Sequence, residues 1–197
     1  MKKWKDKYMN FYSLGPDCRI YSIFYPFLKR GPFDWSFFYG CGSKLANQFI
    51  MNFSKNIDLF INKKYEMQYL GYTVKKTDGF VVEPYAKLSG LCFPHNNVIA
   101  DSNEYIKILY RMLCVYKDIL NKNATFLYLY DSTYDDPNCT KMLKDNLPVI
   151  IISDKHAQFV DVVIDYYSRP YSEAKVNYNY IKNQNKLKEY LNLKFKI

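Results

Sequence analysis

Apolar residues form short continuous runs at three places along the chain, at 9–14 ("MNFYSL"), 125–132 ("TFLYLYDS") and 148–154 ("PVIIISD"). Runs of this length predict buried strands, and strands that are apolar on both faces are typical of parallel sheets. The segment 159–167 alternates between apolar and polar residues, which predicts an edge strand. The segment 72–97 predicts one or two hairpins with a turn at Asp78-Gly79.

Helical spacing of apolar residues alternates with these strands. Helices are predicted at 43–53, 55–63, 102–121 and 138–146, followed by a basic amphipathic helix that begins at about residue 174. The clearest is 102–121, with Ser102 at its N-cap. The apolar stripe predicted for this helix consists of Ile106, Leu109, Leu113, Tyr116 and Leu120.

The order strand, helix, strand over residues 125–154 predicts an α/β fold. We expect one compact domain over residues 1–197, with a central, mostly parallel sheet flanked by helices on both faces. The length of 197 residues fits a single domain, and we see neither an internal repeat nor a linker.

Composition narrows the choice of partners. The net charge is +9, but the lysines are spread along the chain and accompany no nucleic-acid-binding motif, so we expect no specific nucleic-acid partner. No run approaches the ~18 apolar residues of a membrane span.

Five widely spaced cysteines without a C-x-x-C pair argue against a disulfide framework and a zinc site. We expect a reducing, cytoplasmic setting (host cytoplasm for a viral protein), with no metal and no cofactor.

The stretch "YSLGPDCRIY" (12–21) offers the best candidate for chemistry. A buried strand, a Gly15-Pro16 turn and a capping Asp17 place Cys18 at a strand-to-helix turn, in a helix that Pro26 should shorten. The positive end of a helix favours the thiolate, which is the reactive form of cysteine.

The other cysteines lack this predicted setting. Cys41, Cys92 and Cys139 fall in predicted loops or at strand ends, and Cys114 is expected in the core. We therefore expect Cys18 to be the reactive thiol.

A cysteine nucleophile needs a base and a group that orients the base. His95 in "LCFPHNN" and His156 in "SDKHAQF" are the two histidines, and Asp34 and Asp131 are candidate orienting groups. In an open α/β sheet, ligands gather beyond the carboxyl ends of the strands. Polar groups follow three predicted strands at this edge: Ser13 to Cys18, Asp131, and Asp154 with His156.

"SLGPDC", "GPFDW" (31–35), "FPHN" (93–96) and the strand "TFLYLYD" occur in an order that resembles a domain-of-unknown-function family of papain-like cysteine peptidases, found in bacteria and large DNA viruses. The resemblance implies Cys18 as nucleophile, His95 as base and Asp34 as a site residue. It also implies an alternative, papain-like α+β fold. That fold would place Cys18 on a long central helix and His95 on a facing antiparallel sheet.

The first hypothesis is a cysteine-dependent hydrolase, peptidase-like, or an acyl transferase acting on an amide, isopeptide or ester. Cys18 would attack the carbonyl, His95 would relay the proton, and Asp34 or Asp131 would hold the ring. The substrate is an unknown peptide, protein or small molecule. The residues expected to contact it are Ser13, Gly15, Arg19 and Trp35.

Two alternatives remain open. In a transferase-like α/β enzyme, the "SLGPDC" loop would bind a phosphorylated or sugar-nucleotide ligand, with Arg19, Arg30 or Arg111 on the phosphate. The chain could also be an inactive binding protein of the same fold. Only the hydrolase hypothesis requires Cys18 to react faster with a thiol probe than the other cysteines.

Overall fold

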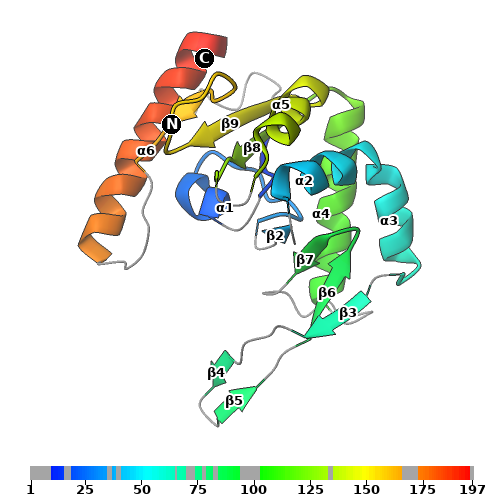
Figure 1. Cartoon of the computed structure of the whole chain (residues 1–197). Helices are drawn as coiled ribbons and strands as arrows, with labels where there is room; N and C mark the ends of the chain where they lie inside the picture. The colour runs from blue at the N-terminus through cyan, green and yellow to red at the C-terminus, as the bar shows by residue number, and fades with distance from the viewer. Residues whose placement is uncertain are drawn as a thin grey trace.

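The structure of the chain is a computed structural model, drawn as a ribbon in Figure 1. It describes the residues in these ranges: 10–15, 19–34, 37–38, 41–64, 66–69, 74–76, 79–81, 84–93, 103–132, 135–165 and 173–195. Three of the candidate site residues, Cys18, Trp35 and His95, lie outside them, as does Ser102, the predicted N-cap of the helix at 102–121.

A parallel sheet forms the centre of the fold, as predicted. Its strand order is β1 (Asn10–Ser13), β8 (Ala124–Leu129), β9 (Val149–Ser153) and β10 (Val162–Val163), and each neighbouring pair is parallel. Both central strands, β8 and β9, are buried along their whole length. This explains their predominantly apolar sequences, because a strand covered on both faces has no solvent-exposed side.

Helices cover both faces of this sheet, which confirms the α/β prediction. One face lies against α1 (Arg19–Phe24) and α6 (Glu173–Phe195), and the other against α4 (Asn103–Leu120) and α5 (Pro137–Asn146). On the α4 side, α2 (Gly42–Met51) packs against α5 and α3 (Phe53–Ile61) packs against α4. The final helix begins within a residue of its predicted start.

Alternation along β8 assigns side chains to the two faces. Phe126 and Tyr128 join the core under α4 and α5, whereas Leu127 and Leu129 join the core under α1 and α6. This is the period of two expected for a strand, with both sets apolar.

The papain-like alternative is wrong for the helix after Cys18. The described part of α1 ends at Phe24, two residues before Pro26, and it packs on a parallel sheet rather than facing an antiparallel one. Proline lacks a backbone N–H and clashes with the preceding turn, so it limits the helix as the sequence predicted.

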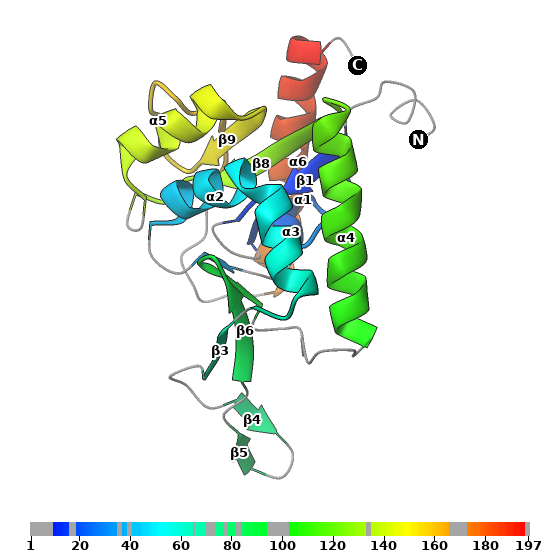
Figure 2. The same ribbon diagram turned by 90° about the vertical axis from the view of Figure 1, so that its right-hand side faces the viewer.

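A second, antiparallel sheet lies below the first in Figures 1 and 2. Its order is β2 (Phe37–Phe38), β7 (Leu91–Phe93), β6 (Pro84–Leu88) and β3 (Glu66–Tyr69). Beyond it, β4 (Val74–Lys76) and β5 (Gly79–Val81) form the hairpin predicted around Asp78-Gly79, although Asp78 itself lies outside the described residues.

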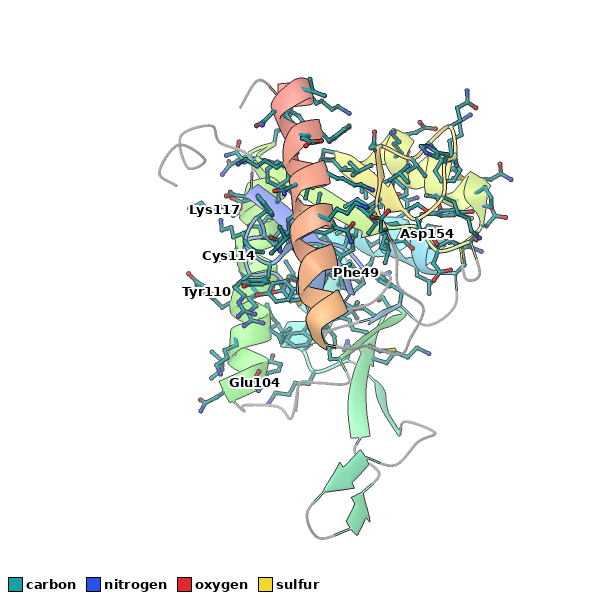
Figure 3. All side chains as sticks on the ribbon, turned by 90° about the vertical axis from the view of Figure 1, so that its left-hand side faces the viewer. Phe49, Glu104, Tyr110, Cys114, Lys117 and Asp154 are labelled. Atoms are coloured by element: carbon teal, nitrogen blue, oxygen red, sulfur yellow. The ribbon has the colours of Figure 1, made fainter. Side chains whose placement is uncertain are left out.

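The stripe predicted for α4 is wrong by one position. The residues that face the core are Tyr105, Ile108, Met112, Val115 and Asp118. Ile106, Leu113 and Leu120 are exposed, and Figure 3 shows Tyr110 and Lys117 on the outer side of the helix while Phe49 lies inside. Both stripes have helical spacing and apolar side chains, so packing against β1 and β8 decides between them.

A buried polar cluster joins α4 to β1. Asp118 accepts hydrogen bonds from Asn10 Nδ2 at 2.8 Å, from the Tyr12 hydroxyl and from Lys29 Nζ at 2.8 Å. Burial alone would raise the pKa of Asp118, but these three donors, above all Lys29, lower it below its usual value. The cluster fixes the side of α4 that faces the sheet.

Within the part of the chain that the structure describes, none of the helices is both long enough and apolar enough to span a membrane.

Candidate functional site

The described polar residues at the carboxyl ends of β1, β8 and β9 lie at one edge of the parallel sheet, as the sequence predicted for Ser13, Asp131, Asp154 and His156. Hydrogen bonds continue to this edge, from Leu14 N to Leu127 O at 3.0 Å and from Leu129 N to Gly15 O at 3.1 Å. Because β1 and β8 are neighbours, Ser13, the last residue of β1, and Asp131, two residues after β8, lie at the ends of adjacent strands. This is the edge where ligands bind in open α/β sheets.

The segment after β1, where the sequence predicts a turn, is described as far as Gly15. Gly15 has a φ of 90°, a conformation that residues with a Cβ rarely adopt. Ser13 is fully buried, and its Oγ has no hydrogen-bond partner within the described part of the chain. Residues 16–18, with Pro16, Asp17 and Cys18, lie outside that part, and Arg19 is described only as the first backbone position of α1.

Asp34 is a buried acid with an unused oxygen. Its exposed fraction is 0%, and its Oδ2 accepts a hydrogen bond from the Gly31 backbone N–H at 3.1 Å. Its Oδ1 has no hydrogen-bond partner among the described residues. Burial raises the pKa of Asp34 to about 7, against the smaller lowering effects of the Gly31 N–H, Arg111 and Arg30. Buried polar groups without partners are rare in proteins, and a catalytic role is one of the reasons for which they occur.

The surroundings of Asp34 come from three elements. Its charge acts on Tyr12 of β1 and on Tyr21 of α1, and Arg111 of α4 acts on it in turn. Arg30 lies 4.0 Å away, and its guanidinium stacks 4.9 Å from the centre of the Tyr21 ring. Asp34 therefore lies beside β1 and α1, the two elements that residues 16–18 connect.

Gly31 allows the chain to pass close to this cluster. A Cβ at this position would lie 3.2 Å from Tyr12 Cδ1 and 3.6 Å from Asp34 Oδ1. The glycine of the "GPFDW" motif thus lets the loop that carries Asp34 approach β1.

Asp34 also lies near the start of the antiparallel pair β2–β7. In that pair Phe37 is opposite Cys92, and Phe38 is opposite Leu91. Asp34 is three residues before Phe37, and His95 is three residues after Cys92. Since antiparallel strands run in opposite directions, the chain entering β2 and the chain leaving β7 are at the same end of the pair. His95 itself lies outside the described residues.

Asp131 belongs to a turn held by a buried acid that the sequence did not single out. Asp135 Oδ1 accepts from the Tyr128 hydroxyl at 2.7 Å and from the Ser43 backbone N–H at 2.9 Å, and its Oδ2 accepts from Asp131 N at 3.1 Å. Burial raises the pKa of Asp135 despite these donors. Asp135 thereby joins β8, the turn after it and the start of α2.

His156 is exposed and follows β9, with β8 lying between β9 and β1. Neighbouring strands are about 4.8 Å apart, so the ends of β9 and β1 are separated by roughly 10 Å. The topology thus places His156 two strands from the strand that precedes Cys18.

The prediction that Cys41 and Cys139 lack a helix N-terminus is wrong. Cys41 is the N-cap of α2, and Cys139 lies in the first turn of α5. Cys92 is buried in β7, and Cys114 is only half-buried rather than a full core residue. The signal in the sequence for Cys41 was its place directly before "GSKLANQF", a segment with helical spacing.

Within the described ranges, the structure has no group of three or more histidine, cysteine or acidic side chains placed to hold a metal ion. Comparisons of the chain with protein-family models, with curated proteins and with solved structures gave no match.

Proposed function

We propose that the protein is a cysteine-dependent hydrolase, peptidase-like, or an acyl transferase, in which Cys18 is the nucleophile, His95 the base and Asp34 the group that orients the base. Its substrate carries an amide, isopeptide or ester carbonyl. The setting that suits such a thiol is the reducing cytoplasm, of the host if the protein is viral. The observation that carries the proposal is the position of Asp34.

On one side, Asp34 is next to the elements that flank Cys18. It interacts with Tyr12 in β1 and Tyr21 in α1, and Cys18 immediately precedes α1 in the sequence. An acid held beside both elements supports a role close to the nucleophile.

Asp34 also precedes β2, and His95 follows β7, the strand that pairs with β2. Phe37 is paired with Cys92. Two residues separate Asp34 from Phe37, and two residues separate His95 from Cys92. This equality supports a contact between the imidazole and the oxygen of Asp34 that has no partner among the described residues.

The chemistry uses each group in turn. The Cys18 thiolate attacks the carbonyl carbon, and the His95 imidazolium gives its proton to the leaving amine or alcohol. Water, or another nucleophile in the transferase case, then releases the acyl group from the sulfur. A carboxyl with a pKa near 7 ionises readily beside an imidazolium, and the carboxylate raises the pKa of the histidine in return.

Asp131 remains the second candidate for the orienting role. Asp131 lies two residues after the end of β8, and β8 is the neighbour of β1. Asp131 is therefore also at the edge of the sheet where Cys18 is expected. Its backbone N–H is fixed by Asp135.

One observation favours the transferase-like alternative. Arg30 and Arg111 both act on Asp34, so two cations lie at the same place, and guanidinium groups bind phosphate. The Asp34 carboxyl weakens the attraction of these two cations for an anion once it ionises. An anion-binding site would survive the loss of Cys18, which separates the two functions.

Acylation by an activated ester tests the proposal. Mixed with p-nitrophenyl acetate, the parent chain should release a rapid burst of p-nitrophenolate, and peptide mapping should locate the acetyl group on Cys18. The Cys18→Ser variant should lose the burst, while Cys139→Ser, at a half-buried thiol in α5, should keep it. An undiminished burst in Cys18→Ser, or acetylation spread evenly over the cysteines, would refute the proposal.

A further inference from the structure

Two half-buried thiols lie where the neighbouring helices α2 and α5 begin. Cys41 is the N-cap of α2, and Cys139 lies in the first turn of α5. The two helices pack side by side, as Figures 1 and 2 show. Neither thiol has a part in the function proposed above.

The dipeptide Asp135-Asp136 fixes both helix starts. Asp135 Oδ1 accepts from Ser43 N of α2 at 2.9 Å. Asp136 caps α5, because its Oδ1 accepts from Asn138 N at 2.8 Å and from Cys139 N at 3.0 Å. Two adjacent residues therefore hold the two cysteine-bearing turns against each other.

The environment makes the two thiols unequal. Burial and the Asp135 carboxylate oppose ionisation of Cys41, yet the backbone N–H groups of Asp136 and Lys44 and the Ser43 hydroxyl, 3.7 Å from the sulfur, lower the pKa of Cys41 below its ordinary value. Burial, Cys41 and Asp136 raise the pKa of Cys139. One thiol is thus the better thiolate, and its neighbour keeps its proton.

We propose that Cys41 and Cys139 are a redox modification site that forms a reversible disulfide between α2 and α5. With a peroxide as oxidant, the Cys41 thiolate attacks one oxygen of H2O2 and becomes a sulfenic acid, and hydroxide leaves. The Cys139 sulfur then attacks the Cys41 sulfur, the S–O bond breaks, and water leaves with the Cys139 proton. Overall, the two thiols together lose two electrons, and these electrons reduce one molecule of peroxide to water. A small dithiol reductant reverses the step by thiol–disulfide exchange.

The test uses the full chain carrying Cys18→Ser, so that a reactive Cys18 cannot take part. The reduced protein is treated with hydrogen peroxide, blocked with iodoacetamide and digested. Mass spectrometry should find a Cys41–Cys139 cross-linked peptide that disappears after treatment with dithiothreitol. Before oxidation, iodoacetamide should label Cys41 about tenfold faster than Cys114, which is also half-buried.

Single substitutions separate the two roles. In Cys139→Ser, dimedone should trap a sulfenic acid on Cys41, whereas in Cys41→Ser it should leave Cys139 unmodified. Oxidation at other cysteines without the cross-linked peptide, or a dimedone adduct on Cys139 in Cys41→Ser, would overturn the proposal. Peptide mapping of the chain with both thiols decides the question even if a serine variant does not fold.

Discussion

Replacing Asp34 with asparagine keeps the shape of the side chain and removes its ability to ionise. The carboxyl is fully buried, and its pKa is about 7 against an ordinary value of 3.8. A raised pKa stabilises the fold below pH 3.8, and this stability is lost as the pH rises towards 7. The asparagine variant has no such dependence.

The size of the effect follows from the shift. Between the two pKa values the parent loses about 1.4 kcal/mol of unfolding free energy per pH unit, or roughly 2 to 3 kcal/mol between pH 5 and pH 8. Arg30 and Arg111, the cations that act on Asp34, already contribute to this value. An imidazolium at His95 would stabilise the carboxylate further and reduce the loss.

The assay is urea unfolding of Asp34→Asn and its parent at both pH values, each also in a His95→Ala background. Between pH 5 and pH 8, the unfolding free energy of Asp34→Asn should rise relative to that of its parent. We expect this gain in full in the His95→Ala background and a smaller gain when His95 is present. Asp58→Asn, at an exposed position in α3, is the control and should follow its parent at both pH values. No relative gain at pH 8 in either background would refute the argument from burial, and equal gains in both would show that His95 does not contact Asp34.

Two further predictions concern stability. Met112→Ala, on the buried side of α4, should lower the unfolding free energy by about 2 to 5 kcal/mol, whereas Leu113→Ala, at the exposed neighbouring position, should lower it by under about 1 kcal/mol. The reverse order in urea unfolding would contradict the assignment of the buried face. Asp118→Ala leaves the buried Tyr12 hydroxyl without its acceptor and should cost about 2 to 4 kcal/mol at pH 7. That cost should shrink as the pH falls below 3.8 and through the lowered pKa of Asp118, because protonation of Asp118 removes the same charge-assisted hydrogen bonds from the parent. A cost that stays constant down to pH 2 would contradict this.

Local sequence signals were sufficient for the central sheet. The apolar runs of β8 and β9 and the capped helix between them depend on neighbours in the chain, so they could be predicted. The buried face of α4 could not, because Met112 and Leu113 belong to stripes that are equally apolar. Only contacts with residues far along the chain select one of them.

The candidate site was predictable only in part. Burial of Asp34 follows from its aromatic neighbours, but its proximity to α1 and to the two-residue strand β2 depends on long-range pairing. The setting of Cys41 likewise depends on Asp135 and Asp136, which are more than ninety residues away in the sequence. A pattern read along the chain carries no signal for such a contact.

The rate of iodoacetamide alkylation at Cys18, measured against pH, tests the central claim most directly. In the parent we expect fast alkylation that persists well below pH 8.5, about the pKa of an ordinary thiol, because a histidine partner keeps the sulfur ionised. His95→Ala should slow the reaction at pH 7 and move its midpoint up to about 8.5, while His156→Ala should leave both unchanged. If His95→Ala alters neither the rate nor the midpoint, Cys18 has no partner at His95, and the proposed hydrolase mechanism is wrong.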